Sequence, residues 1–203
     1  ASSNTGVGFE ALTSNTTGEL NTAIGFHAMK DNSTGDRNVA VGYGALQDMN
    51  VTDGSHTFNT ALGFAAGEST STGAQNTFVG ANAGNGNTTA ANNVAVGYQS
   101  LLTNTTGATN VAVGTFAMLA NTSASNNVAV GQSAMQANTT GTANTAVGSF
   151  ALDANTTAAN NTAFGNHALG ATTTGASNVA VGRNALAALT TAASNCAFGT
   201  GAG

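Results

Sequence analysis

A short motif, mostly of the form Asn-x-Ala-x-Gly, recurs twelve times along the 203-residue chain, and its spacing constrains the fold more than any other feature. Successive copies follow a 17-residue period, with one 21-residue interval between Asn38 and Asn59. A fixed period over a whole chain is typical of repeat architectures, in which each repeat contacts only its neighbours. The copies begin at Asn4, Asn21, Asn38, Asn59, Asn76, Asn93, Asn110, Asn127, Asn144, Asn161, Asn178 and Asn195.

Each motif predicts a short β-strand. We number columns by their distance from the motif Asn: the first column holds Val, Thr or Cys, the second is almost always Ala, the third is apolar, and the fourth is Gly. Short runs of β-branched residues closed by Gly favour strands. Because alternate residues of a strand face opposite sides, the first and third columns share one face. We expect that face to fill the coil interior, which would bury Val96, Val113, Val130 and Val147.

The predicted fold is an all-β, parallel β-solenoid of about twelve 17-residue turns, with residues 1–203 as one body. Turns spaced about 4.8 Å apart would give a rod near 58 Å long. Two features leave alternatives open. Gly and Ala alternate fourteen residues after the Asn, so one turn could instead span two motifs, with a 34-residue period. The Ala-Leu/Met segment seven and eight residues after the Asn could form a second strand or a helical turn. The four extra residues, within 47–58, should bulge outward.

The motif Asn is invariant, and stacking would align its side chains as a ladder of amides, which stabilises stacked strands. The predicted structural Asn ladder includes Asn76, Asn93, Asn110, Asn127, Asn144, Asn161 and Asn178.

The Ala and Gly columns suggest a face that something packs against closely, because neither column contains a large polar residue in any copy. The opposite wall of the coil or a neighbouring chain could impose this limit, and the scarcity of charge favours the neighbour. We therefore predict side-by-side self-association through an inter-chain or close-packing face. It comprises Ala95, Ala112, Ala129, Ala146, Ala163 and Ala180, with Gly97, Gly114, Gly131, Gly148, Gly165 and Gly182.

The composition argues against several classes of function. Only 3 basic and 8 acidic residues are present, too few basic groups for a binder of nucleic acid driven by phosphate contacts. No apolar run approaches the ~18 residues that a membrane span requires. His27, His56 and His167 lie far apart in sequence without paired ligands, and Cys196 stands alone, so we expect no metal, no cofactor and no catalysis. Neither end resembles a capping repeat, which predicts a segment of a longer fibre.

Two sequence patterns, the glycosylation sequons and the paired Thr residues, suggest functions for the predicted surface. Nine Asn-x-Ser/Thr sequons occur, seven of them in one column, and turn formation explains that column better than glycans that would collide on successive turns. Paired Thr residues such as Thr105 and Thr106 invite an ice-binding interpretation, but adjacent residues of a strand point in opposite directions.

Asn-Val-Ala-Val-Gly followed by a small residue and Leu resembles the head repeats of trimeric autotransporter adhesins, and is similar to repeat shafts of phage tail fibres. The resemblance implies a left-handed parallel β-roll, three chains side by side, display on a cell or virion surface, and attachment to a surface receptor or glycan. The adhesin repeat is typically shorter than the period found in this chain. The leading hypothesis is therefore a structural or adhesive extracellular fibre segment without catalysis. The alternative is an ice- or carbohydrate-binding solenoid that uses exposed Thr/Asn or aromatic columns.

Overall fold

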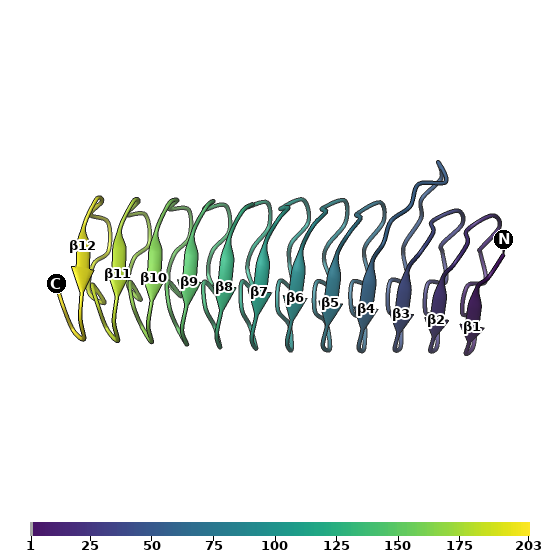
Figure 1. Ribbon diagram of the computed structural model, residues 1–203, viewed down its shortest axis with the longest axis horizontal. Coiled ribbons are helices and arrows are strands. Elements are labelled where there is room, and N and C mark those ends of the chain that lie inside the picture. Colours follow the sequence, from purple (N-terminus) through teal and green to yellow (C-terminus); the bar gives the residue numbers. More distant parts are fainter. Residues whose placement is uncertain (1) are drawn as a thin grey trace.

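The computed structural model describes residues 2–203, and these residues form a solenoid with one parallel sheet along its side (Figure 1). The sheet holds twelve strands in sequence order, each of three residues. They are β1 (Thr5–Val7), β2 (Thr22–Ile24), β3 (Val39–Val41), β4 (Thr60–Leu62), β5 (Thr77–Val79), β6 (Val94–Val96), β7 (Val111–Val113), β8 (Val128–Val130), β9 (Thr145–Val147), β10 (Thr162–Phe164), β11 (Val179–Val181) and β12 (Cys196–Phe198).

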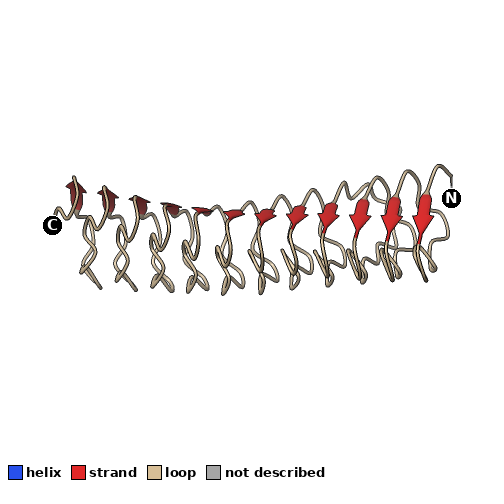
Figure 2. Cartoon of the chain, turned by 90° about the horizontal axis from the view of Figure 1, so that it is seen from below, coloured by secondary structure: helices blue, strands red, loops and turns tan. Residues whose placement is uncertain are grey.

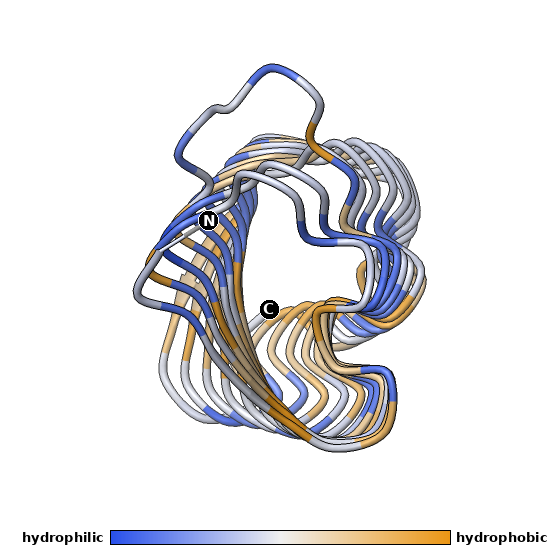
Figure 3. Cartoon of the chain, turned by 90° about the vertical axis from the view of Figure 1, so that its right-hand side faces the viewer, coloured by the Kyte–Doolittle hydropathy of each residue, from blue (hydrophilic) through white to orange (hydrophobic). Residues whose placement is uncertain are grey.

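The coil has a 17-residue turn, which confirms the shorter of the two predicted periods. Val111 pairs with Val128 and Ala112 with Ala129, so every residue lies beside its own column in the next turn. Twelve strands bound eleven turns, giving a sheet about 53 Å long at ~4.8 Å per strand. The 21-residue interval between β3 and β4 keeps this register, pairing Val39 with Thr60. Its extra residues project from the coil as a loop (Figures 1 and 3).

The Ala-Leu/Met segment, seven and eight residues after the motif Asn, is neither a strand nor a helix. In most turns its Leu or Met lies within a turn and adopts a left-handed backbone, with φ of 52° at Leu101, 50° at Met118 and 51° at Met135. That conformation is unfavourable for residues with a Cβ and persists only where the surroundings fix it. Here the side chains are completely buried, and Leu101 N–H donates to Ala117 O of the next turn at 2.9 Å. Burial and axial hydrogen bonding therefore offset the backbone strain.

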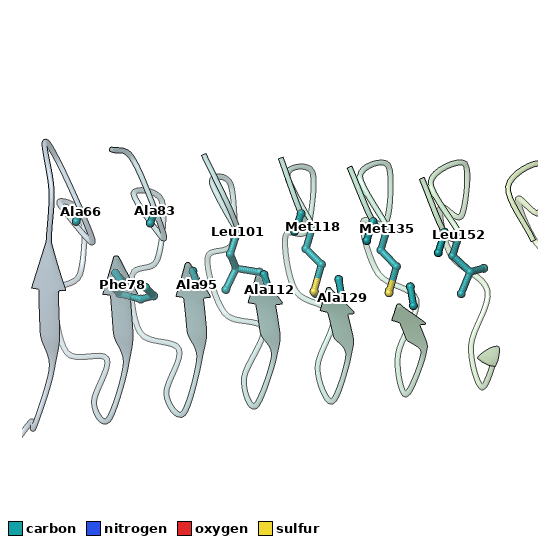
Figure 4. Close-up of a cluster of buried hydrophobic side chains, with 14 of the residues drawn as sticks. Ala66, Phe78, Ala83, Ala95, Leu101, Ala112, Met118, Ala129, Met135 and Leu152 are labelled. Carbon is teal, nitrogen blue, oxygen red and sulfur yellow. The ribbon is translucent and has the colours of Figure 1, made fainter. Parts of the chain in front are cut away.

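The strand faces the opposite way from our sequence prediction. Ala95, Ala112, Ala129, Ala146, Ala163 and Ala180 are fully buried inside the coil, whereas Val96, Val113, Val130 and Val147 are only partly buried and lie on the outward face. The predicted Ala face is therefore a close-packing face within one chain and cannot be the contact between chains. The reason is the width of the coil: the Leu and Met side chains of the opposite wall already fill the space between the walls (Figure 4).

Phe78 shows how tightly the two walls fit. It is the one large residue in the Ala column, and it is fully buried. In its own turn and the one before, the opposing Leu/Met column holds Gly84 and Gly67 instead. A Cβ added to Gly67 would lie 2.5 Å from Phe78 Cδ2, and one added to Gly84 would also collide with the ring. One Phe thus occupies the volume that two Leu or Met side chains fill elsewhere.

The Gly column is required by the backbone rather than by another chain. Gly131 has φ of 135°, a value that side-chain-bearing residues rarely adopt. A Cβ placed on it would lie 2.6 Å from the carbonyl oxygen of Gly148 in the next turn. The same collision recurs along the predicted Gly face from Gly97 to Gly182. Close approach of successive turns therefore explains this column.

The motif Asn column forms a buried ladder in which each side chain bonds to the backbone and, in several turns, also to the next motif Asn side chain, as Asn144 Nδ2 does to Asn127 Oδ1 at 3.3 Å. Asn127 Oδ1 accepts the backbone N–H of Asn144 in the next turn at 2.9 Å, and Asn127 Nδ2 donates to Gly141 O at 2.9 Å. The Oδ1 contact to the next backbone N–H repeats at Asn76, Asn93, Asn110, Asn144, Asn161 and Asn178. Because buried backbone groups must be paired, the side chain satisfies one N–H per turn just before each strand.

A second Asn column, eleven residues after the motif Asn, forms a ladder of side-chain amides. Asn104 Nδ2 donates to Asn87 Oδ1 at 3.0 Å, and Asn121 Nδ2 donates to Asn104 Oδ1 at 2.7 Å. The ladder ends where the column changes to Thr172, and the oxygen Oδ1 of Asn155 has no hydrogen-bond partner among the described residues. Both ladders lie inside the coil, so they hold successive turns together without depending on solvent-exposed groups.

The outward position of Val130 predicts that Val130→Asp leaves the single chain folded. A new charge on a solvated face should change the free energy of unfolding by less than about 1 kcal/mol, because surface substitutions rarely do more. Denaturant unfolding of the dispersed chain measures this change. Thr145→Asp, which replaces another outward strand residue, is the matched control. Loss of cooperative folding in Val130→Asp alone would contradict the outward assignment.

Candidate interaction surface

The outward face of the sheet is a strip of apolar and Thr side chains. Each strand presents its first and third residues outward, which gives pairs such as Thr22 with Ile24 and Val94 with Val96. The strip is well exposed in the first four strands, where Val7, Ile24 and Leu62 have exposed fractions of 57%, 40% and 48%, and again at Phe198 of β12 with 72%. Side chains of this kind normally avoid water. The strip is therefore the first candidate for contact with a partner.

An aromatic column runs along the first four turns, two residues beyond the third column. Phe9, Phe26, Tyr43 and Phe64 stack with centroid separations of 5.1–5.2 Å and interplanar angles of 5–15°. Each ring exposes between 40% and 63% of its residue surface. The continuous run of four stops at Ala81, and Tyr98, one turn further on, is an exposed ring of the same column outside this run. We call these four residues the aromatic ladder.

Charged groups lie beside the aromatic ladder. Glu10 Oε2 lies 2.8 Å from Lys30 Nζ and 3.0 Å from His27 Nε2. The hydrogen bond from Lys30 lowers the pKa of the Glu10 carboxyl, and the same contact raises the pKa of Lys30. All three groups are accessible to solvent, so this is a surface ion-pair cluster of small energetic weight.

The three histidines lie in separate places. His27 contacts Glu10, His56 Nδ1 lies 2.9 Å from Asp36 Oδ2, and the His167 ring stacks on Phe150 at 5.0 Å. Within residues 2–203, no group of three or more His, Cys, Asp or Glu residues could hold a metal ion. Partial burial raises the pKa of Asp153, but no second ionisable group hydrogen-bonds to it within the described chain.

Cys196 is exposed on the first column of β12 rather than buried, as its place in the Val/Thr column had suggested. The reason is that this column faces outward. Neither a pocket nor a membrane-spanning helix occurs in the part of the chain that the structure describes.

Burial separates the sequons into two kinds. Asn32, Asn87, Asn104, Asn121, Asn138 and Asn155 belong to the second Asn ladder and have no exposed surface, so their side chains are committed to structure in the folded chain. Asn50, whose N–H donates to Ser71 O of the next turn just before the projecting loop, and Asn160 are exposed. The paired Thr column also has a structural role, because Thr105 Oγ1 donates to Thr122 O in the next turn at 3.0 Å.

Comparisons of this chain with protein-family models, with curated proteins and with solved structures found no match. The exposed surfaces of the solenoid are therefore the features from which a function can be proposed. The aromatic columns entered the sequence-based hypotheses only as a possible ligand-binding surface, and stacking of Phe9, Phe26, Tyr43 and Phe64 was not predicted. Their recurrence at the motif period, in four successive copies, was the signal that they stack.

Proposed function

We propose that this chain is a structural segment of an extracellular fibre, with no catalytic role, in which copies lie side by side. The observation that carries the proposal is the outward apolar strip, which follows the whole sheet while the interior is already filled. Two buried Asn ladders and a continuous parallel sheet make each chain a rigid rod. A rigid rod with one apolar side is suited to mechanical support and display.

The scarcity of charge supports assembly. All of the net charge of −5 comes from residues up to Glu68, where seven acidic residues accompany Lys30 and Arg37; Asp153 and Arg183 cancel beyond it. Isolated chains with a nearly uncharged surface have low solubility. The predicted threefold arrangement now rests on the resemblance to adhesin heads, because the Ala face that first suggested close packing lies inside the coil.

Light scattering combined with small-angle X-ray scattering tests the proposal. We expect a mass that is a small multiple of 19.6 kDa and a length that stays near 53 Å, because chains side by side thicken a rod without lengthening it. A particle that lengthens with each added chain would indicate end-to-end association instead. A 19.6 kDa monomer at high concentration would remove the self-association on which the fibre proposal depends.

One observation favours ice binding as a second candidate. In strands such as β8 and β9 the outward Thr and Val residues are separated by one inward Ala, which gives two regular outward columns. However, the strands rotate progressively from β1 to β12 (Figure 2), so the columns follow a twisted surface rather than a plane. A thermal-hysteresis assay distinguishes the two: we expect no activity from a fibre segment.

Carbohydrate binding is supported less well by the aromatic ladder. Sugars stack on the faces of aromatic rings, whereas in this ladder each inner ring covers the faces of its neighbours. Only ring edges, and the outer faces at the two ends, are free. A glycan array on the assembled protein tests this alternative.

A further inference from the structure

We infer that the aromatic ladder is an interface between copies of this chain, and that neighbouring copies run parallel with the aromatic ladder of one against the aliphatic column of the next. The aliphatic column is the third residue of each of the first four strands: Val7, Ile24, Val41 and Leu62. The inference rests on the proposed self-association and adds the site, the orientation and the contacting residues.

The first argument is area. An aromatic residue can bury about 200 Å², so four half-exposed rings leave on the order of 400 Å² of apolar surface. The adjacent aliphatic column raises the exposed patch to on the order of 500 Å², near the upper end for a monomeric protein. The outward Val and Thr residues of the remaining turns extend the strip towards the ~800 Å² per partner of a standard interface.

The second argument is the chemistry of the exposed ring edges. Because Phe26, Tyr43 and their neighbours stack along the solenoid axis, their edges point away from the coil. A ring edge carries partial positive charge, so it attracts neither a cation nor another ring edge. Aliphatic side chains such as Ile24 and Leu62 can pack against it without this penalty. The patch therefore fits an apolar aliphatic surface that repeats at the same spacing.

A second copy supplies that surface with a matching repeat. Two identical rods share the same rise per turn, so a contact made in one turn recurs in every turn. A twofold axis that runs parallel to the solenoid turns the second strip to face the first with its left and right edges interchanged. The aromatic ladder of one chain then lies over the aliphatic column of its neighbour. This relation holds for two parallel chains and equally for three, where each aromatic ladder meets the aliphatic column of the next chain.

An antiparallel arrangement lacks this complementarity. A twofold axis perpendicular to the solenoid would reverse the order of the turns and keep each column against itself. It would place the aromatic ladder against Ser149, Asn166, Arg183 and Thr200, the polar residues that occupy the same column near the other end. Parallel chains are therefore favoured, because they bring aromatic against aliphatic side chains, whereas antiparallel chains bring aromatic against polar ones.

Parallel packing also has an electrostatic consequence. It brings together the N-terminal turns of the two chains, which in each chain carry a combined net charge of −5. Salt screens such repulsion, with a Debye length of ~10 Å at 0.1 M and ~3 Å at 1 M. Association should therefore strengthen several-fold between 0.05 and 0.5 M NaCl, whereas antiparallel chains, whose charged turns lie apart, should respond weakly.

The experiment combines a variant pair with a distance measurement. Phe26→Ser/Phe64→Ser removes two exposed rings of the ladder, and Phe58→Ser/Phe150→Ser is the matched control, since these two rings lie in other columns. At one salt concentration, analytical ultracentrifugation should show that the ladder variant associates at least about tenfold more weakly than the parent. The control should associate within about twofold of the parent. Circular dichroism checks that both variants fold.

The parent chain provides an independent readout through its single cysteine. A nitroxide on exposed Cys196 should report a distance below about 20 Å between parallel chains, whereas fully overlapped antiparallel chains would separate the two labels by roughly 50 Å. Equal affinities of the ladder and control variants, or the long distance, would overturn this inference while leaving the fibre proposal intact. A parent that stays monomeric would overturn both.

Discussion

Phe78→Ala is expected to lower the free energy of unfolding by about 3–5 kcal/mol, the range for removing a buried aromatic side chain. The upper part of that range applies because the cavity cannot collapse. The ring is fully buried, and the opposing positions Gly67 and Gly84 have no side chains that could move into the vacated space. Denaturant unfolding monitored by circular dichroism measures the loss.

The same site offers a compensating change. Gly84→Leu alone should destabilise the chain by about 1–3 kcal/mol or more, because the new side chain collides with Phe78. Combined with Phe78→Ala and Gly67→Leu, it should restore most of the stability. Gly67 and Gly84 already have φ of 60°, close to the values of 48–56° that Leu adopts in this column elsewhere. Strictly additive effects of these changes would show that the two columns do not face each other.

This pair of columns also shows how far sequence reasoning reached. The period, the strands and the parallel stacking followed from the spacing of Asn, Ala and Gly, because a repeat of short β-branched segments has few other ways to bury its backbone. The inward face did not follow, because Val and Ala both suit strands and alternation alone cannot say which face is inside. Phe78 opposite Gly67 and Gly84 was the decisive clue, since only residues that face each other compensate in volume.

The candidate surface was less predictable for the same reason. If the Ala column faced outward, its small side chains would indicate close contact with a neighbouring chain. Because the column faces inward, the opposite wall of the coil explains why only small side chains fit. The apolar residues predicted to form the core, such as Val130, are partly buried on the outward strip instead. Self-association therefore remains a proposal, but it now depends on a different face. Among residues 2–203, no group of three or more His, Cys, Asp or Glu residues could hold a metal ion, so the surface is the feature on which a functional proposal depends.

The second large effect concerns the buried Asn ladder. Asn127→Leu removes the acceptor of the Asn144 N–H, which lies inside the coil with no water to replace it. An orphaned buried donor costs about 1–3 kcal/mol, and the loss of the amide bond to Gly141 O adds about 1 kcal/mol more. Gly141 O itself keeps a second donor, Asn138 Nδ2, at 3.0 Å, which limits the damage. Ser123→Ala, which changes an exposed side chain on the turn, is the control and should change the stability little.

Asn127→Asp should lower the free energy of unfolding more at pH 7 than at low pH. The introduced carboxylate would keep an acceptor for the Asn144 N–H, but it would face the carbonyl of Gly141 without a proton and be buried without a cation. An uncompensated buried charge costs about 3–5 kcal/mol. Burial raises the carboxyl pKa in the folded state above its unfolded value of ~3.9. The folded variant is therefore favoured by protonation, so its deficit relative to the parent should shrink as the pH falls through the folded pKa and become smallest below ~3.9. Unfolding at pH 7 and pH 4 measures the difference. A deficit that does not change between pH 7 and pH 4 would show that the introduced group is solvated, and that the ladder does not lie in the dry interior.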